Sequence, residues 1–155
     1  MTQQIGSLGN DGAPRLKILL SGVFSQTPQE FEAIIDTGFS GFVCMPLLHA
    51  FPLGLPLFGT SGVTVADGRS SYKLTAQVIA QLGDVKKIGV VILEPNSNDV
   101  LIGIDFLRTF EKALFIHTLR PTVVLEDCKV LDEAISIKAA DLAPAKGPDD
   151  KKAEP

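Results

Sequence analysis

The feature that most constrains this chain is an apolar run that ends abruptly at a carboxylate. Residues 33–35 are Ala-Ile-Ile, Asp36 follows them, and the chain then turns at Thr37 and Gly38. A strand with this pattern places the Asp36 carboxylate at the edge of a hydrophobic interior, where carboxylates are candidate acid/base groups. Gly38 lets the backbone turn without a Cβ, and the Thr37 hydroxyl can bond to nearby main chain. The sequence therefore predicts a tight loop that presents Asp36 rigidly.

A second apolar motif lies further along the chain. Leu101, Ile102 and Gly103 come shortly before a segment, residues 105–110, that has the pattern of a short helix. In this order the two motifs resemble the retropepsin-like aspartic proteases of the single-domain, retroviral type. In that family Asp-Thr-Gly follows a hydrophobic strand, and two apolar residues and a glycine form a strand beside the catalytic loop. The resemblance covers about residues 16–125.

The resemblance implies an all-β fold. We expect a closed retropepsin-like β-barrel with a flap hairpin and one short helix near the C-terminal part. It also implies that Asp36 is catalytic, that Thr37 hydrogen-bonds across a dimer axis and that Gly38 offers its backbone to the substrate. The supporting residues of the catalytic loop would be Thr37, Gly38, Leu101, Ile102 and Gly103.

A hairpin is predicted between residues 60–66 and 72–80, which both alternate apolar and polar side chains. Asp67-Gly68 between them is a strong hairpin-turn dipeptide. Most such hairpins are structural, but the resemblance implies that this one is a flap over the substrate. A two-stranded lid would exclude water and add main-chain hydrogen bonds to an extended peptide. The tip of the flap would consist of Ala66, Asp67, Gly68 and Arg69.

The remaining elements follow from local periodicity. In the strand over 72–80, the polar face with Lys73 and Thr75 is expected in solvent. Residues 134–138 predict either a strand or part of a helix. Further strands are predicted at 16–24, 31–35, 41–45, 88–93, 100–102, 113–117 and 122–125, and a helical turn at 47–51.

The length of 155 residues fits one domain with a sizeable core, and 45% of the residues are hydrophobic. Residues 1–14 mix Gly, Asn, Asp, Gln and Pro and predict a flexible N-terminal arm. We assign residues 15–138 to the retropepsin-like domain. Residues 139–155 contain almost no large apolar side chain and predict a disordered C-terminal tail.

Composition excludes several functions. The net charge of −4 and pI near 5.1 leave no basic stripe for phosphates, so no nucleic-acid partner is expected. No apolar run reaches the ~20 residues of a membrane span, and the first residues form no secretory signal. We therefore expect a soluble, cytoplasmic protein without a membrane partner.

Metal and cofactor chemistry has no support in the sequence. Cys44 and Cys128 lack the CxxC spacing, and His49 and His117 stand alone in apolar surroundings. Packed or surface roles explain both histidines. No metal and no cofactor is expected.

Asp-Thr-Gly occurs once, whereas a two-lobed aspartic protease would carry it or a close variant twice. This chemistry needs two carboxylates within roughly 3 Å that share one proton. The partner of Asp36 must therefore be Asp36 of a second copy across a two-fold axis. The sequence predicts a homodimeric aspartic endopeptidase that hydrolyses extended peptide or protein substrates. Asp105 is assigned a structural role in the first turn of a helix.

Phe39 departs from the family, in which a small Ser, Thr or Ala follows Asp-Thr-Gly and a hydroxyl there bonds the outer carboxylate oxygen. That bond is absent unless Ser40 or a water replaces it. The departure leaves room for an alternative, a catalytically silent retropepsin-like module that binds peptides or dimerises. A third reading, a β-barrel binding domain unrelated to proteases, requires that the two motifs do not meet in space.

Overall fold

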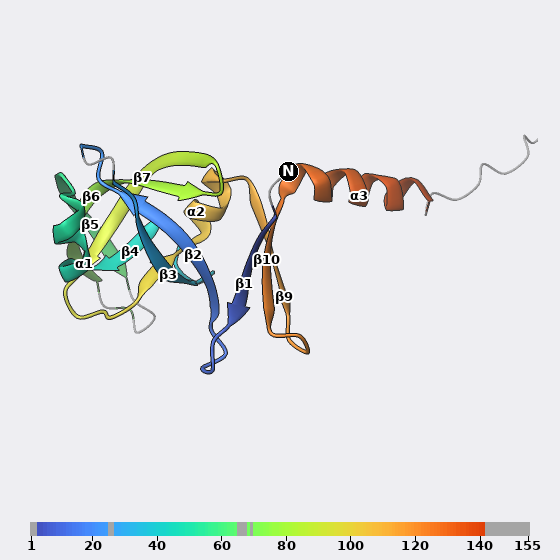
Figure 1. Cartoon of the computed structure of the whole chain (residues 1–155), viewed down its shortest axis with the longest axis horizontal. Helices are drawn as coiled ribbons and strands as arrows, with labels where there is room; N and C mark the ends of the chain where they lie inside the picture. The colour runs from blue at the N-terminus through green and yellow to red at the C-terminus, as the bar shows by residue number, and fades with distance from the viewer. Residues whose placement is uncertain (1–2, 25–26, 65–67, 69, 142–155) are drawn as a thin grey trace, which may run out of the picture.

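The computed structural model describes residues 3–24, 27–64, 68 and 70–141. In this part of the chain, ten strands form one continuous sheet (Figure 1). The strands are β1 (Gln4–Leu8), β2 (Pro14–Ser21), β3 (Gln29–Ile35), β4 (Val43–Pro46), β5 (Leu57–Thr64), β6 (Ser70–Leu82), β7 (Val85–Glu94), β8 (Val100–Ile102), β9 (Lys112–His117) and β10 (Thr122–Asp127). The helices are α1 (Leu47–Leu53), α2 (Ile104–Thr109) and α3 (Cys128–Asp141).

The sheet closes on itself. The strand order is β5-β6-β7-β4-β8-β3-β2-β1-β10-β9, and an additional pairing of β6 with β2 joins six of the strands into a barrel. The long strand β6 makes this closure possible, because its first half pairs with β5 and its second half reaches β2. The predicted all-β, retropepsin-like barrel is confirmed.

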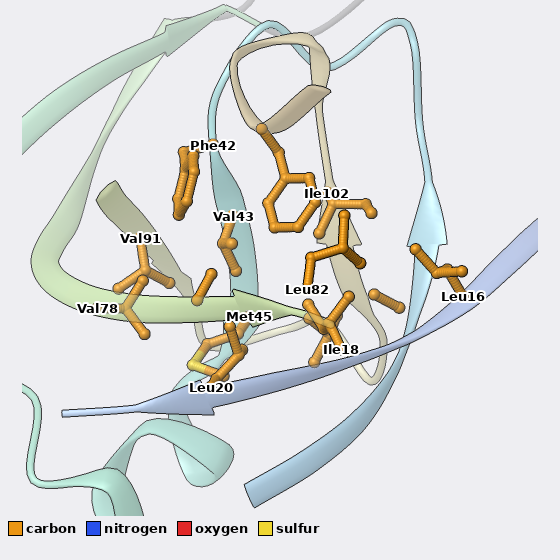
Figure 2. Close-up of a cluster of buried hydrophobic side chains, with 14 of the residues drawn as sticks. Leu16, Ile18, Leu20, Phe42, Val43, Met45, Val78, Leu82, Val91 and Ile102 are labelled. Atoms are coloured by element: carbon orange, nitrogen blue, oxygen red, sulfur yellow. The ribbon is translucent and has the colours of Figure 1, made fainter. Parts of the chain in front are cut away.

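The barrel interior is filled by the apolar side chains that alternate along its strands. Figure 2 shows these side chains pointing toward one another from opposite walls. Leu20, Val43, Val78 and Ile102 have no exposed surface. At one end, the rings of Phe42 and Phe106 lie 5.2 Å apart and fix α2 against the barrel.

Three strands extend the sheet beyond the barrel. β1, β10 and β9 lie side by side, and α3 continues away from them (Figure 1). The prediction of a flexible arm over residues 1–14 is wrong for residues 4–8, because residues 4–7 pair with β10 and residues 7–8 pair with β2. This strand could not be recognised from the sequence, because only Ile5 and Leu8 in it are large and apolar.

The C-terminal part ends in a helix. Residues 134–138, for which strand and helix were both open, belong to α3, and so do residues 139–141 of the predicted tail. Residues 142–155 lie outside the described residues. No helix in the described part of the chain is long and apolar enough to cross a membrane.

Candidate active site

The loop that carries Asp36 connects two strands, β3 and β4, that lie on either side of a third strand, β8. β3 leads into the loop and β4 leaves it, and β8 lies between them, parallel to β3 and antiparallel to β4. Ile34 is opposite Leu101 and Ile35 is opposite Ile102. The two sequence motifs therefore lie side by side. The alternative of a β-barrel binding domain unrelated to proteases required them to lie apart, and this requirement is not met.

Backbone hydrogen bonds tie the loop to the end of β8. Asp36 N–H donates to the Ile102 carbonyl at 3.0 Å, and Gly103 N–H donates to the Phe42 carbonyl at 3.2 Å. Ile104 N–H donates to the Phe39 carbonyl at 2.9 Å. These bonds use main-chain groups on both sides, so the loop cannot move without breaking the junction to β8 and α2.

Gly103 is required by this close approach. A Cβ at this position would stand 2.3 Å from the Phe39 carbonyl oxygen and 2.4 Å from that of Gly41. Both obstacles are backbone atoms of the loop. The predicted close approach of the backbone at Gly103 thus has a direct steric basis.

The Asp36 side chain is half-buried and held from one side. Its Oδ1 accepts the N–H of Gly38 at 2.9 Å. This bond fixes the carboxylate within its own turn and is its one hydrogen bond to the described residues. Thr37 is exposed.

Phe39 is accommodated by two glycines. A Cβ on Gly41 would stand 2.4 Å from Phe39 Cζ, and one on Gly103 would stand 2.7 Å from Phe39 Cδ1. The ring therefore lies over positions that have no side chain. Ser40 is exposed, and no hydrogen bond of its hydroxyl to Asp36 occurs within the described residues. The possible replacement of the missing bond by Ser40 is thus not realised in this chain.

The hairpin that was predicted to be a flap, here called the flap hairpin or flap, is formed by β5 and β6. Their register runs out to Thr64 opposite Ser70, whose hydroxyls are 2.9 Å apart. At the predicted tip, Gly68 has a positive φ of 83°, as a hairpin turn requires. Ala66, Asp67 and Arg69 lie outside the described residues.

In the outer half of the flap, the exposed and buried faces of β6 are the opposite of those predicted. Tyr72 and Leu74 are exposed, whereas Thr75 is buried and Lys73 is half-buried. The polar face, expected in solvent, is turned toward the Asp36 loop. The predicted alternation along the strand is correct, but in this half of β6 the polar face is the buried one and the apolar face is exposed.

Two hollows lie between the flap and the Asp36 loop. The larger, of about 330 Å³, contains Asp36 and reaches between β4, β6 and β7. The smaller, of about 230 Å³, is lined by residues of the loop and of β5. The larger hollow, here called the Asp36 pocket, is lined by Asp36, Gly38, Phe39, Cys44, Thr64, Lys73, Ile92, Glu94, Ser97 and Leu101.

Sequence reasoning missed an ion pair in this pocket. Lys73 Nζ lies 2.7 Å from Glu94 Oε2, and both side chains are about one-quarter exposed, at 23% each. The hydrogen bond from Lys73 lowers the pKa of Glu94, so Glu94 carries its charge at neutral pH. Burial raises the pKa of Cys44 to about 11, and nearby Glu94 adds to this, so Cys44 is a neutral thiol.

Asp105 lies in the first turn of α2, as predicted. Its N–H donates to the Ser40 carbonyl at 3.3 Å, and its carboxylate is 4.0 Å from Arg108. The described residues contain no cluster of His, Cys, Asp or Glu that could hold a metal ion.

Two solved structures share this fold. A retropepsin-like aspartic protease from Rickettsia conorii matches with a TM-score of 0.57 and 14% sequence identity, covering 81% of this chain and 90% of that one. The EIAV protease complexed with the inhibitor HBY-793 matches with a TM-score of 0.55 and 14% identity, covering 70% of this chain and 97% of that one. No protein-family model and no curated protein sequence matches the chain. At such identities the likeness shows the fold alone, and the chain therefore has a retropepsin-like all-β fold.

Proposed function

We propose that this protein is an aspartic endopeptidase that acts as a homodimer. The observation that carries the proposal is the Asp36 loop, in which the carboxylate is fixed by Gly38 N–H and opens onto a pocket beneath the flap. The likeness of the fold to retropepsin-like proteases supports the same chemistry.

A second carboxylate must come from another chain. Within the described residues, Glu94 is the other carboxylate that lines the Asp36 pocket. It is engaged by Lys73 at 2.7 Å, and its Oε1 accepts the N–H of Asn96 at 3.3 Å. A carboxylate paired with a cation cannot share a proton with Asp36 at neutral pH, because pairing favours its charged form. We therefore assign the second carboxylate to Asp36 of the partner, across a two-fold axis.

The proposed mechanism uses one proton shared between the two carboxylates. The ionised carboxylate takes a proton from water while the water oxygen attacks the scissile carbonyl carbon. The protonated carboxylate donates its proton to the carbonyl oxygen, so a tetrahedral diol forms. The diol then collapses as the C–N bond breaks: the protonated carboxylate donates its proton to the leaving amine, and the ionised one takes a proton from a diol hydroxyl, which restores the shared proton. Thr37 would stabilise the paired loops, and the flap strands would bind the peptide in extended form.

Cleavage by the purified full-length chain is the test. A peptide library is incubated with the wild type at several pH values between about 3 and 7, and the products are identified by mass spectrometry. Asp36→Asn should lower kcat/KM by at least about a thousandfold, since it removes a general acid/base group. Asp105→Asn, a change in a carboxylate outside the pocket, should leave kcat/KM within a few-fold of the wild type.

Sedimentation of the same variants measures the dimer. Retained dimerisation in Asp36→Asn, together with lost cleavage, supports the enzyme. Equal cleavage by Asp36→Asn and the wild type contradicts it.

A silent module remains the second candidate, and Phe39 is the observation that favours it. Phe39 replaces the small residue that the family carries and fills space beside the carboxylate. On this proposal the wild type binds extended peptides and dimerises but cleaves none, and Asp36→Asn leaves both properties unchanged.

A further inference from the structure

The Asp36 pocket contains a charged pair on the side of the flap. Leu74 of β6 is opposite Leu93 of β7, so Lys73 and Glu94 are the next cross-strand neighbours and lie on the other face of the sheet from the two leucines. This face is the one that looks onto Asp36. The pair is therefore part of the wall that a bound peptide would meet.

The pair has hydrogen-bonding capacity left over. An ammonium group has three donors and no acceptor, and one donor of Lys73 is directed at Glu94. No other partner of Lys73 occurs among the described residues. The two oxygens of Glu94 accept one bond each, from Lys73 and from Asn96 N–H, and a carboxylate can accept more.

Apart from Asp36, the other residues that line the pocket are uncharged. Phe39, Ile92 and Leu101 supply apolar walls, and Cys44 is a neutral thiol. The charges of Lys73 and Glu94 balance, so the pocket combines apolar walls with one free donor group and one free acceptor group.

We propose that the Asp36 pocket is a subsite that selects a peptide side chain ending in a primary carboxamide, Asn or Gln. This inference rests on the proposed function, since it treats the Asp36 loop as the place where the peptide backbone lies. The carboxamide oxygen accepts from Lys73, and its NH₂ donates to Glu94. The methylene groups of Gln cover the apolar walls.

Other side chains fit this pocket less well. An aliphatic side chain shields Lys73 from water without giving it an acceptor, and such unpaired groups cost affinity. A carboxylate is attracted by Lys73 but repelled by Glu94. A cationic side chain is attracted by Glu94 but repelled by Lys73. A carboxamide satisfies both groups without adding charge, because its acceptor oxygen and its donor NH₂ are on separate atoms.

Matched peptides test the subsite in the active enzyme. Each of the positions next to the scissile bond is occupied in turn by Gln, Glu, Lys or Leu, and kcat/KM is measured for the full-length protein. At one position Gln should exceed Leu by about tenfold, the effect of one hydrogen bond to a charged group. Lys73→Met should reduce this ratio to near one by lowering kcat/KM of the Gln peptide.

Two variants control for indirect effects. Lys17→Met removes an exposed cation whose Nζ is likewise 2.7 Å from a carboxylate, that of Glu30, and should leave the Gln-to-Leu ratio unchanged. The double variant Lys73→Glu/Glu94→Lys keeps an ion pair and should keep the preference, because a carboxamide can turn its two ends around. Thermal unfolding followed by circular dichroism shows whether each variant is folded.

A binding measurement separates this inference from the proposed function. Asp36→Asn is titrated with fluorescent Gln and Leu peptides, and affinity is read by fluorescence anisotropy. Tighter binding of the Gln peptide, lost in Asp36→Asn/Lys73→Met, supports the subsite even if the wild type cleaves nothing. A Gln-to-Leu ratio near one, one that persists without Lys73, or no binding of either peptide overturns the subsite, whether or not the wild type cleaves other peptides.

Discussion

The ring of Phe39 lies over Gly41, so that a Cβ on Gly41 would stand only 2.4 Å from Phe39 Cζ. Gly41→Ala should therefore push the ring aside and lower the free energy of unfolding by about 1–3 kcal/mol, the usual cost of overpacking. Removing the ring removes the obstacle. In the Phe39→Ala background, Gly41→Ala should cost much less, and urea unfolding of the four proteins gives the coupling energy.

Gly62→Ala is the control for this pair. Gly62 is also near the Asp36 loop, but a Cβ there would be 3.9 Å from the nearest side-chain atom, that of Tyr72. Its free energy of unfolding should stay within about 0.5 kcal/mol of the wild type. Strict additivity of the Phe39 and Gly41 changes would contradict the packing described for the ring.

Phe39 also lines the pocket that contains the Asp36 carboxylate. If two copies share one proton at this site, the ring limits access of water and disfavours the doubly charged pair. Phe39→Ser should let the shared proton leave at a lower pH, so the basic limb of the pH–rate profile of kcat/KM should move downward. A limb that stays in place or moves upward would count against this role of the ring.

The strands of the barrel were predictable from sequence because their apolar patterns and turn residues are local, whereas their closure into a barrel was implied by the resemblance to the retropepsin-like family. Residues 33–35 and 100–102 are apolar, and Asp67-Gly68 is a hairpin-turn signal by itself. Asp36 and Gly103 could be selected because each belongs to a short contiguous motif. Such signals need no knowledge of the tertiary pairing.

The pocket could not be predicted in the same way. Lys73 and Glu94 are 21 residues apart and become neighbours only through the register of β6 with β7. Periodicity tells which residues share a face but not which face is turned toward the Asp36 loop, so the face with Lys73 was expected in solvent. β1 was missed for a related reason: it has few apolar residues, and its strand conformation depends on pairing with β10, which is distant in sequence.

The Lys73–Glu94 pair makes stability depend on pH in a definite direction. The pKa of Glu94 is lowered by its hydrogen bond to Lys73. The pair therefore contributes stability above the unfolded-state pKa of about 4.3, and this contribution is lost as the pH falls through the folded-state value. Lys73→Met should cost about 1 kcal/mol near pH ~7, and the difference from the wild type should shrink toward pH ~3.

Urea unfolding of wild type and Lys73→Met between these pH values measures the effect. Lys17→Met, in which an exposed pair is lost, should differ from the wild type by less than the Lys73 variant at neutral pH. A Lys73→Met difference that is constant with pH would mean that lost packing of the lysine stem, and not the pairing of Glu94, dominates.

Cys44 gives the fourth prediction, because its thiol lines the same pocket as Asp36. Burial raises the pKa of Cys44 to about 11, whereas an ordinary thiol titrates near ~8.5. Only a thiolate reacts with iodoacetamide, so the rate of Cys44 alkylation in native Cys128→Ser should rise about tenfold per pH unit from ~7 to ~10. Mass spectrometry of quenched samples gives the rate. In guanidinium, the alkylation rate of the same variant should level off near pH ~9.

If the alkylation rate of the native protein also levels off there, Cys44 is not shielded, and the pocket wall between β4 and β7 is more open than described. A bound peptide should slow alkylation further, since the β4 strand that carries Cys44 begins where the Asp36 loop ends.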